Sequence, residues 1–448
     1  MSAVRPRGRW PVLRAVFSAL VLLAVVLTAA VWFLNTRGEV DVGGAVIAAT
    51  GPADQTLIER GAYLARAGNC AGCHTARGGE SYAGGLGIAT PFGTVYTSNL
   101  TSDQATGIGS WSSAHFWRAM HNGRSKDGRL LYPAFPYTSY TKVTREDSDA
   151  LYAFLQSRPA VTQANREHGV GFPYNTQAAL AVWRALYFRP GTFENEAART
   201  AEWNRGAYLV QGLGHCSACH SARNALGATS GGLDLEGGLI PMQNWYAPSL
   251  ASADEAGVGH WSRAEIASLL KTGVSPRASV TGPMGEVVLR STQYLSDPDL
   301  DAMAQYLQAL PGTHEGPAAG TSLASARARP AADRTGAALG AQLYDQHCAQ
   351  CHGDKGQGVA NAYPALGGNR AVTMTNTANL VQIVLNGGYA PATQGNPRPY
   401  GMPPFVLVLN DQDIATVLTH VRQSWGNQAD AVTRFDVNRI RAGSGGGR

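Results

Sequence analysis

This sequence has little charge, few sulfur-containing residues and no recognisable nucleotide-binding loop. Charged residues make up 15% of its 448 residues, and the 36 Lys and Arg residues are scattered along a chain of net charge +5. Such a distribution argues against a nucleic-acid-binding surface. No Gly-x-Gly-x-x-Gly run follows a predicted strand, so a dinucleotide-dependent enzyme is not indicated. We therefore expect that the chain alone does not catalyse a dehydrogenation.

The few cysteines that are present form one motif, Cys-x-x-Cys-His, in three copies. The copies are Cys70-Ala-Gly-Cys73-His74, Cys216-Ser-Ala-Cys219-His220 and Cys348-Ala-Gln-Cys351-His352, and they use all six cysteines. This spacing is typical of c-type haem attachment, in which two thiols bind one haem and the histidine ligates its iron. Zinc needs four ligands, a redox dithiol does not need the histidine, and disulfides between such close neighbours are uncommon. The motif predicts three covalently bound haems c.

The longest apolar run lies near the N-terminus. Residues 15–34 contain no charge, and 20 such residues are enough for a helix to cross a bilayer. Residues 1–14 carry four arginines, and a basic flank of this kind stays in the cytoplasm. A cleavable signal peptide is the alternative, although its apolar region is usually shorter. We expect an uncleaved anchor in the cell inner membrane, with the haem-carrying part on the periplasmic side.

The chain repeats itself around the three motifs. Gly61-Ala-Tyr-Leu precedes the first motif, Gly206-Ala-Tyr-Leu precedes the second, and Gly340-Ala-Gln-Leu-Tyr precedes the third. A tyrosine and a tryptophan recur at an offset of 150 residues in the first two repeats, as Tyr96 and Trp111, then Tyr246 and Trp261. Such self-similarity predicts three related domains, of which the first two are the more alike.

Each repeat ends in a pattern typical of an amphipathic helix with acidic residues in its first turn. The expected N-caps of these closing helices are Thr144, Ser296 and Asn410. Two connections separate the repeats. Residues 311–336 are rich in Pro, Gly, Ala and Ser and are expected to be flexible. Residues 158–200 contain an apolar helix at 178–188, which either packs against its own chain or docks a partner.

The predicted fold is therefore mainly α, with a transmembrane helix followed by three domains that have long loops. The expected boundaries are a cytoplasmic flank at 1–14, an anchor at 15–34, a first domain at 55–157, a linker at 158–200, a second domain at 201–310, a linker at 311–336, a third domain at 337–425 and a tail at 426–448.

A haem that only transfers electrons generally has a second axial ligand, and methionine is a common one. The chain contains seven methionines. Met402 and Met284 each lie shortly before a closing helix, in Gly401-Met-Pro-Pro404 and Gly282-Pro-Met-Gly285. We expect these two thioethers to ligate the third and second haems. The alternative is that each fills a gap in the core.

The first repeat has no methionine at the corresponding place. Its loop reads Leu131-Tyr-Pro-Ala-Phe-Pro-Tyr137, with Phe135 where the third repeat has Met402. His121 and Met120 remain as candidates for the sixth ligand, just before Gly123, which should end a helix. A vacant or water-bound position is the third alternative, and all three remain open at this point.

These motifs together resemble the trihaem cytochrome c subunit of bacterial membrane-bound dehydrogenases, with class I cytochrome c domains. The resemblance covers roughly residues 55–425 and includes Tyr-Pro-Ala-Phe-Pro-Tyr, Gly-Pro-Met-Gly-Glu-Val-Val and Gly-His-Cys-Ser-Ala-Cys-His-Ser-Ala-Arg-Asn-Ala-Leu-Gly. The family includes cytochrome subunits of alcohol, gluconate, aldehyde and nicotinate dehydrogenases. Its members generally carry a methionine ligand for the first haem as well, and this chain departs from that pattern.

The resemblance implies an electron-transfer role. A separate catalytic subunit would oxidise the substrate, and electrons would pass through the three haems to ubiquinone or a terminal oxidase. Two other functions compete with this one. The chain could be a stand-alone electron carrier, or an open first haem could make it a haem enzyme.

Overall fold

The structure is a computed structural model that describes residues 10–39, 42, 54–229, 234–312, 334–360 and 362–444. Helices predominate and the strands are short, in agreement with the mainly α fold expected from the sequence. Most of the linker expected at 311–336 lies outside the described residues. Residues 54–157, 201–310 and 334–425 each contain one Cys-x-x-Cys-His motif, and we call them the first, second and third units.

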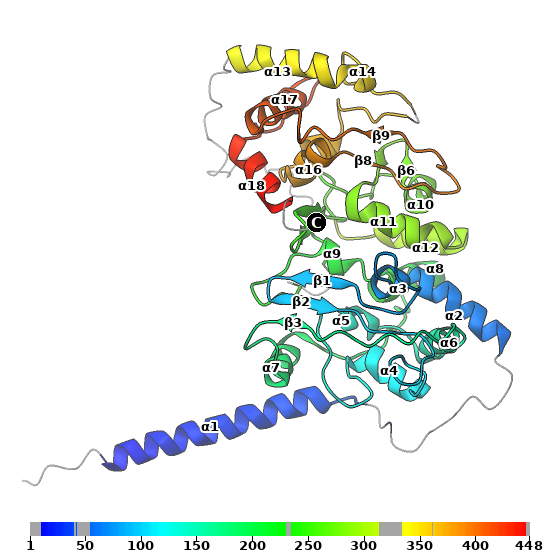
Figure 1. Cartoon of the computed structure of the whole chain (residues 1–448), viewed down its shortest axis with the longest axis vertical. Coiled ribbons are helices and arrows are strands. Elements are labelled where there is room, and N and C mark those ends of the chain that lie inside the picture. Colours follow the sequence, from blue (N-terminus) through cyan, green and yellow to red (C-terminus); the bar gives the residue numbers. More distant parts are fainter. Residues whose placement is uncertain are drawn as a thin grey trace, which may run out of the picture.

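The first helix, α1 (Trp10–Thr36), projects away from the rest of the molecule (Figure 1). Residues 12–36 are long and apolar enough to cross a membrane, and none of the most apolar stretch is buried by other parts of the chain. The end of α1 is held by α7 (Gln177–Tyr187). The Asn35 side chain donates to the Ala181 carbonyl (2.9 Å) and accepts from the Arg184 guanidinium (2.9 Å).

Each unit is framed by an opening helix and a closing helix. The opening helices are α2 (Gln55–Ala67), α8 (Ala201–Tyr208) and α13 (Arg334–His347). The closing helices are α6 (Arg145–Gln156), α12 (Asp297–Gln308) and α17 (Asp411–Gln423). In every unit the opening helix packs against the closing helix.

Between these two helices lie a short motif helix and a middle helix. The motif helices are α3 (Cys70–His74), α9 (Ser217–His220) and α14 (Ala349–His352). The middle helices are α4 (Ser113–Asn122), α10 (Arg263–Thr272) and α16 (Ala378–Asn386). Shorter helical segments are α5 (Tyr137–Tyr140), η1 (Leu209–Leu213), α11 (Gly282–Arg290), η2 (Thr292–Tyr294) and α15 (Arg370–Thr373).

The strands form small antiparallel pairs at the edges of the units. In the first unit β1 (Gly87–Thr90) and β2 (Gly93–Tyr96) are joined by β3 (Gly169–Val170), with Ile88 opposite Val95. The other pairs are β4 (Gly238–Ile240) with β5 (Trp245–Ala247), β6 (Val274–Ser275) with β7 (Ala278–Ser279), and β8 (Gly388–Tyr389) with β9 (Gly401–Met402).

The repeated glycine at the start of each unit permits the helix crossing. A Cβ atom on Gly61 would overlap the Ala150 carbonyl of α6, and one on Gly206 would overlap the Ala302 carbonyl of α12. In the third unit a Cβ on Gly340 would lie 2.8 Å from the Cβ of His420. Only glycine lets the two backbones approach this closely.

The closing helices begin where the sequence predicted. The side chains of Thr144, Ser296 and Asn410 accept hydrogen bonds from the backbone N–H groups of Asp147, Asp299 and Asp413. Each cap satisfies a donor that the first helical turn leaves free.

The first and second units share one hydrophobic core, whereas the third unit has its own. The shared core joins Leu64 and Leu151 of the first unit to Leu213 and Leu300 of the second. The core of the third unit is built around Ile414 and Val421. The first two repeats are therefore packed as one body.

Two reciprocal polar contacts cross between the first and second units. Asp147 of α6 accepts from Arg60 of its own unit (Nε, 2.9 Å) and from the Tyr208 hydroxyl of the second unit (2.6 Å). Asp299 of α12 accepts from Arg205 of its own unit (Nε, 2.8 Å) and from the Tyr63 hydroxyl of the first unit (2.6 Å). The tyrosine hydroxyl of each unit thus donates a hydrogen bond to the aspartate of the other unit's Arg–Asp pair.

The second unit also contacts the third. Asn379 of α16 exchanges two hydrogen bonds with the backbone of Tyr246, at 2.8 and 2.7 Å. Arg370 donates to the carbonyls of Ala253 and Gly257, each at 2.8 Å. Figure 1 accordingly shows the second unit between the first unit, below it, and the third, above it.

The structure adds detail to three segments. In the expected linker at 158–200, β3 pairs with β2 of the first unit and α7 packs against α1, so this linker contacts its own chain. In the expected tail, α18 (Arg434–Ser444) packs against α17 and buries Val437 and Ile440. Met284 lies in the first turn of α11 rather than in a loop, since Pro283 favours the start of a helix there.

Candidate haem sites

The histidines of the three motifs are oriented in the same way. Their Nδ1 atoms contact backbone carbonyl oxygens, which are those of Ser98 for His74 (2.7 Å), Pro248 for His220 (2.7 Å) and Pro364 for His352 (2.9 Å). A carbonyl oxygen can only accept, so each Nδ1 carries the proton and each Nε2 keeps its lone pair. This is the tautomer that ligates a metal through Nε2.

The three imidazoles are also held neutral. Burial lowers the pKa of His74, His220 and His352, and the hydrogen bonds to the carbonyls oppose this shift only in part. Burial in a medium of low dielectric disfavours the imidazolium. A neutral ring is required for iron ligation.

The cysteines fit thioether formation better than zinc binding. None of the six is in a disulfide. Burial raises the pKa of the Cys70 and Cys216 thiols to about 12 and that of Cys348 to about 11, because it disfavours the charged thiolate. Within the described ranges, no group of three His, Cys, Asp or Glu side chains could hold a metal ion.

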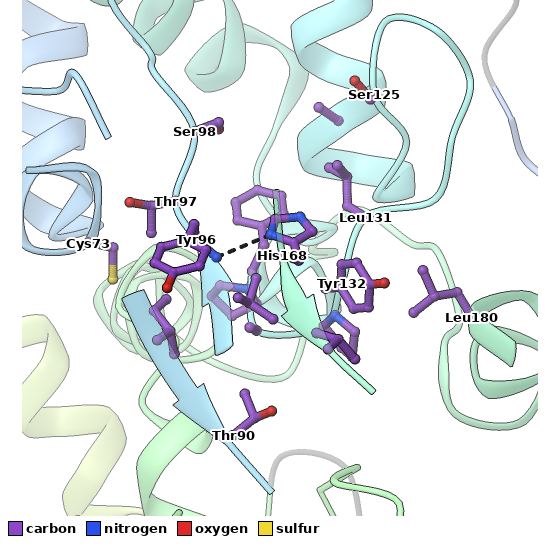
Figure 2. A pocket seen from close by; sticks show the side chains of 18 of the residues that line it. Cys73, Thr90, Tyr96, Thr97, Ser98, Ser125, Leu131, Tyr132, His168 and Leu180 are labelled. Carbon is purple, nitrogen blue, oxygen red and sulfur yellow. Dashed lines mark hydrogen bonds between the residues drawn. The ribbon is translucent and has the colours of Figure 1, made fainter. Parts of the chain in front are cut away.

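A cavity of about 1740 Å³ contains the first motif, with Cys70, Cys73 and His74 on its wall. Its lining is mostly apolar and includes Phe116, Phe135, Tyr140 and Leu151. Figure 2 shows Cys73 and Tyr96 on one side of this space and Tyr132 on the other, with His168 beside Tyr96. Two thiols, a ligand-competent imidazole and apolar walls around one large cavity are what a covalently bound haem requires.

The first and second motifs adjoin each other. The cavity that contains Cys73 extends to Cys219 of the second unit. The Gly68 carbonyl, two residues before Cys70, accepts from the Tyr140 hydroxyl (3.1 Å) and from the His215 ring, which directly precedes Cys216. Groups attached at these two motifs would therefore be neighbours.

The two expected distal methionines lie beside the matching cores. Met284 packs against the core shared by the first and second units, and Met402, in β9, packs against the core of the third. Both are partly buried.

The two candidates in the first unit lie in different surroundings. Met120 is 6% exposed and lines the cavity of the first motif. His121 is absent from the cavity wall. Its ring stacks on Trp117 (4.5 Å between centroids, 12° between planes), and its Nδ1 donates to the Thr141 carbonyl (2.9 Å). The geometry thus favours Met120 over His121 as a group that could face a haem.

Sequence reasoning missed several residues that shape these sites. Ser98 supplies the carbonyl that orients His74, and the offset of 150 that aligns it with Pro248 could have indicated this role. His168 faces the first cavity from the expected linker, where no motif marks it. Leu180 and Trp183 of α7 also line the cavity, so the apolar helix at 178–188 packs in part against its own chain.

Covalent attachment motifs with oriented histidines, in small helical units, define a c-type cytochrome. The sequence profile of the family described as cytochrome c matches residues 58–159 and 337–425. The chain is 40% identical to the cytochrome c subunit of quinone-type alcohol dehydrogenase from Gluconacetobacter polyoxogenes, covering 89% of this chain and 87% of that protein. It is 38% identical to the gluconate 2-dehydrogenase cytochrome c subunit of Pantoea cypripedii, covering 87% and 90%.

The chain belongs to the family of cytochrome c subunits of dehydrogenases. It is also similar to a dihaem c-type cytochrome from Cereibacter sphaeroides, with 37% identity over 56% of this chain and 85% of that protein.

Proposed function

We propose that this chain is the trihaem electron-transfer subunit of a membrane-bound periplasmic dehydrogenase. It would accept electrons from a separate catalytic subunit and pass them to ubiquinone or a terminal oxidase. The observation that carries the proposal is the threefold recurrence of one arrangement, in which two cysteines precede a histidine whose Nδ1 is bound to a carbonyl. The relatives named as dehydrogenase cytochrome subunits support the partner.

Haem supplies the one-electron chemistry, and the chain supplies attachment, axial ligands and spacing. Cys70 and Cys73, Cys216 and Cys219, and Cys348 and Cys351 would hold the three haems. His74, His220 and His352 would be their proximal ligands, and Met284 and Met402 the distal ligands of the second and third. Thioether ligation opposite histidine raises the reduction potential, which suits an acceptor of electrons from an enzyme.

The arrangement of the units supports a linear electron path. The second unit shares its core with the first and makes hydrogen bonds to the third. The second haem would then be the intermediate between the other two.

We predict three covalent haems per chain. Replacing both cysteines of one motif by alanine should remove one haem, because a vinyl group without a thiol partner leaves the haem extractable. The pyridine haemochrome spectrum of the denatured, extracted protein measures this count, with wild type expected at three and each double variant at two. A wild-type value of two or four would contradict the proposal.

We also predict that α1 is retained and anchors the chain. Deleting residues 1–34 should move the protein from the membrane fraction to the soluble fraction when a cleavable export signal replaces them, because the exposed apolar surface of α1 is removed. N-terminal sequencing of the full protein should find a start before residue 31. A mature chain that begins later would mean that the segment is a signal peptide.

A further inference from the structure

We propose that Met120 supplies the sixth iron ligand of the first haem, the role proposed for Met284 and Met402 in the other two units. The inference rests on the proposed haem at Cys70 and Cys73, and it assigns a role to a residue of the middle helix α4. It implies that the first haem is a closed Met/His site, rather than a site that is open to exogenous ligands.

Phe135 occupies the place of the missing loop ligand. It aligns with Met402 through the following proline, and it lines the first cavity. Its ring packs against Tyr140 (5.3 Å between centroids) and Tyr137 (6.4 Å). A phenyl ring has no lone pair for iron, so the loop can cover the haem but cannot ligate it.

Met120 approaches the same cavity from α4. With Phe116 and Ala119, at i−4 and i−1, it forms the stripe of this helix that lines the cavity. The helix packs against α5, which begins two residues after Phe135. Met120 and the Phe135 loop therefore belong to adjoining elements of one cavity wall.

The second unit has no methionine at the position that matches Met120. The offset of 150 residues that aligns Gly123 with Gly273, the glycines that end α4 and α10 in the left-handed conformation, aligns Met120 with Leu270. Leu270 is 8% exposed, a buried hydrocarbon in a unit that has Met284 for its iron. In the first unit the thioether lies on the middle helix α4, whereas the middle helix α10 of the second unit carries a hydrocarbon at the matching position.

The imidazole of His168 faces the cavity but has the wrong tautomer for ligation. Its Nδ1 accepts a hydrogen bond from the Tyr96 backbone N–H (3.1 Å), drawn as the dashed line in Figure 2. A nitrogen that accepts cannot carry the proton, so in the neutral ring Nε2 is protonated and has no lone pair for iron. Its edge-to-face contact with Tyr132 (4.9 Å) holds the ring in this orientation.

The two other imidazoles near the first motif are also committed elsewhere. The His215 ring donates to the Gly68 carbonyl, two residues before Cys70, so this ring is held against the backbone beside the attachment cysteines. His121 has a ligand-competent tautomer, but its ring stacks on Trp117 and is absent from the cavity wall. Lys126 also lines the cavity, but its amine donates to the Ser110 carbonyl (2.7 Å), which leaves the Met120 thioether as the candidate ligand.

The test uses the full chain with its haems, purified in detergent. In the ferric wild type, near-infrared magnetic circular dichroism should show three methionine-to-iron charge-transfer contributions, and the ferrous protein should bind no carbon monoxide. Met120→Leu should remove one of the three contributions and allow one haem to bind carbon monoxide, since leucine has no lone pair. Adding Phe135→Met to that variant should restore the lost contribution if the loop lies over the iron.

Met303→Leu is the matched control, because Met303 is a buried methionine in α12 and is absent from the cavity wall. It should leave all three contributions unchanged. Carbon monoxide binding by the wild type, or a Met120→Leu spectrum with all three contributions, would overturn the proposal. If the variant does not mature, the wild-type measurements decide alone. The pyridine haemochrome count tests the proposed function separately, because it registers haem whatever its sixth ligand.

Discussion

Replacing both Cys216 and Cys219 by alanine is expected to stop electron flow through the subunit while two haems remain. The second unit lies between the other two, with a shared core on one side and the Tyr246–Asn379 hydrogen bonds on the other. Without its haem, the outer haems would be separated by the whole second unit. In the complete complex, substrate-driven acceptor reduction should fall to background. Only one of the two remaining haems should be reduced rapidly by the catalytic subunit.

The matched control removes a terminal haem instead. Replacing Cys348 and Cys351 by alanine leaves the first and second haems adjacent, so these two should still be reduced or oxidised together. Stopped-flow absorbance during substrate addition distinguishes the two variants, since the remaining haems should respond as a pair only in this control. If both haems that remain in the Cys216 and Cys219 variant were reduced at the wild-type rate, the linear path would be wrong.

Asp147→Ala is expected to destabilise the first two units by about 2–3 kcal/mol. The Asp147 side chain is 3% exposed and accepts from Arg60 and from the Tyr208 hydroxyl. The substitution leaves that hydroxyl buried without its acceptor. The Arg60 side chain is 54% exposed and regains water, which keeps the loss below that of a fully buried pair. The effect is measured as a shift in the midpoint of urea unfolding. Unfolding is monitored by the loss of the haem absorbance that depends on the distal ligand.

Asp149→Ala is the control for this prediction. Asp149 lies on the same helix and pairs with Arg145, but both side chains are more than a third exposed. Removing it should change the stability by no more than about 0.5 kcal/mol. Tyr208→Phe should cost about 1–2 kcal/mol, since it deletes only the contact between the units. Equal effects of Asp147→Ala and Asp149→Ala would show that the reciprocal contacts do not hold the two units together.

Those reciprocal contacts could not be predicted from the sequence. Arg60, Tyr63 and Asp147 lie in ordinary amphipathic patterns, and nothing local shows that Tyr63 reaches Asp299 of the next repeat. The contact depends on how two domains pack, which is set by the combined shapes of four helices. The same holds for α18, whose few apolar residues become a buried face only once α17 is present.

By itself the sequence determined the features that depend on short spacing. Two cysteines three residues apart with a histidine next to them predict haem attachment. Thr144, Ser296 and Asn410 begin their helices, and Gly61, Gly206 and Gly340 mark the close helix crossings. The tertiary structure decided which side chains share a cavity. It placed Met120 on the cavity wall and left His121 off that wall. Adjacent residues on a helix point about 100° apart, and only packing decides which of them faces the core. It also joined the first two units in one hydrophobic core, because the apolar faces of their helices are complementary in shape and bury each other.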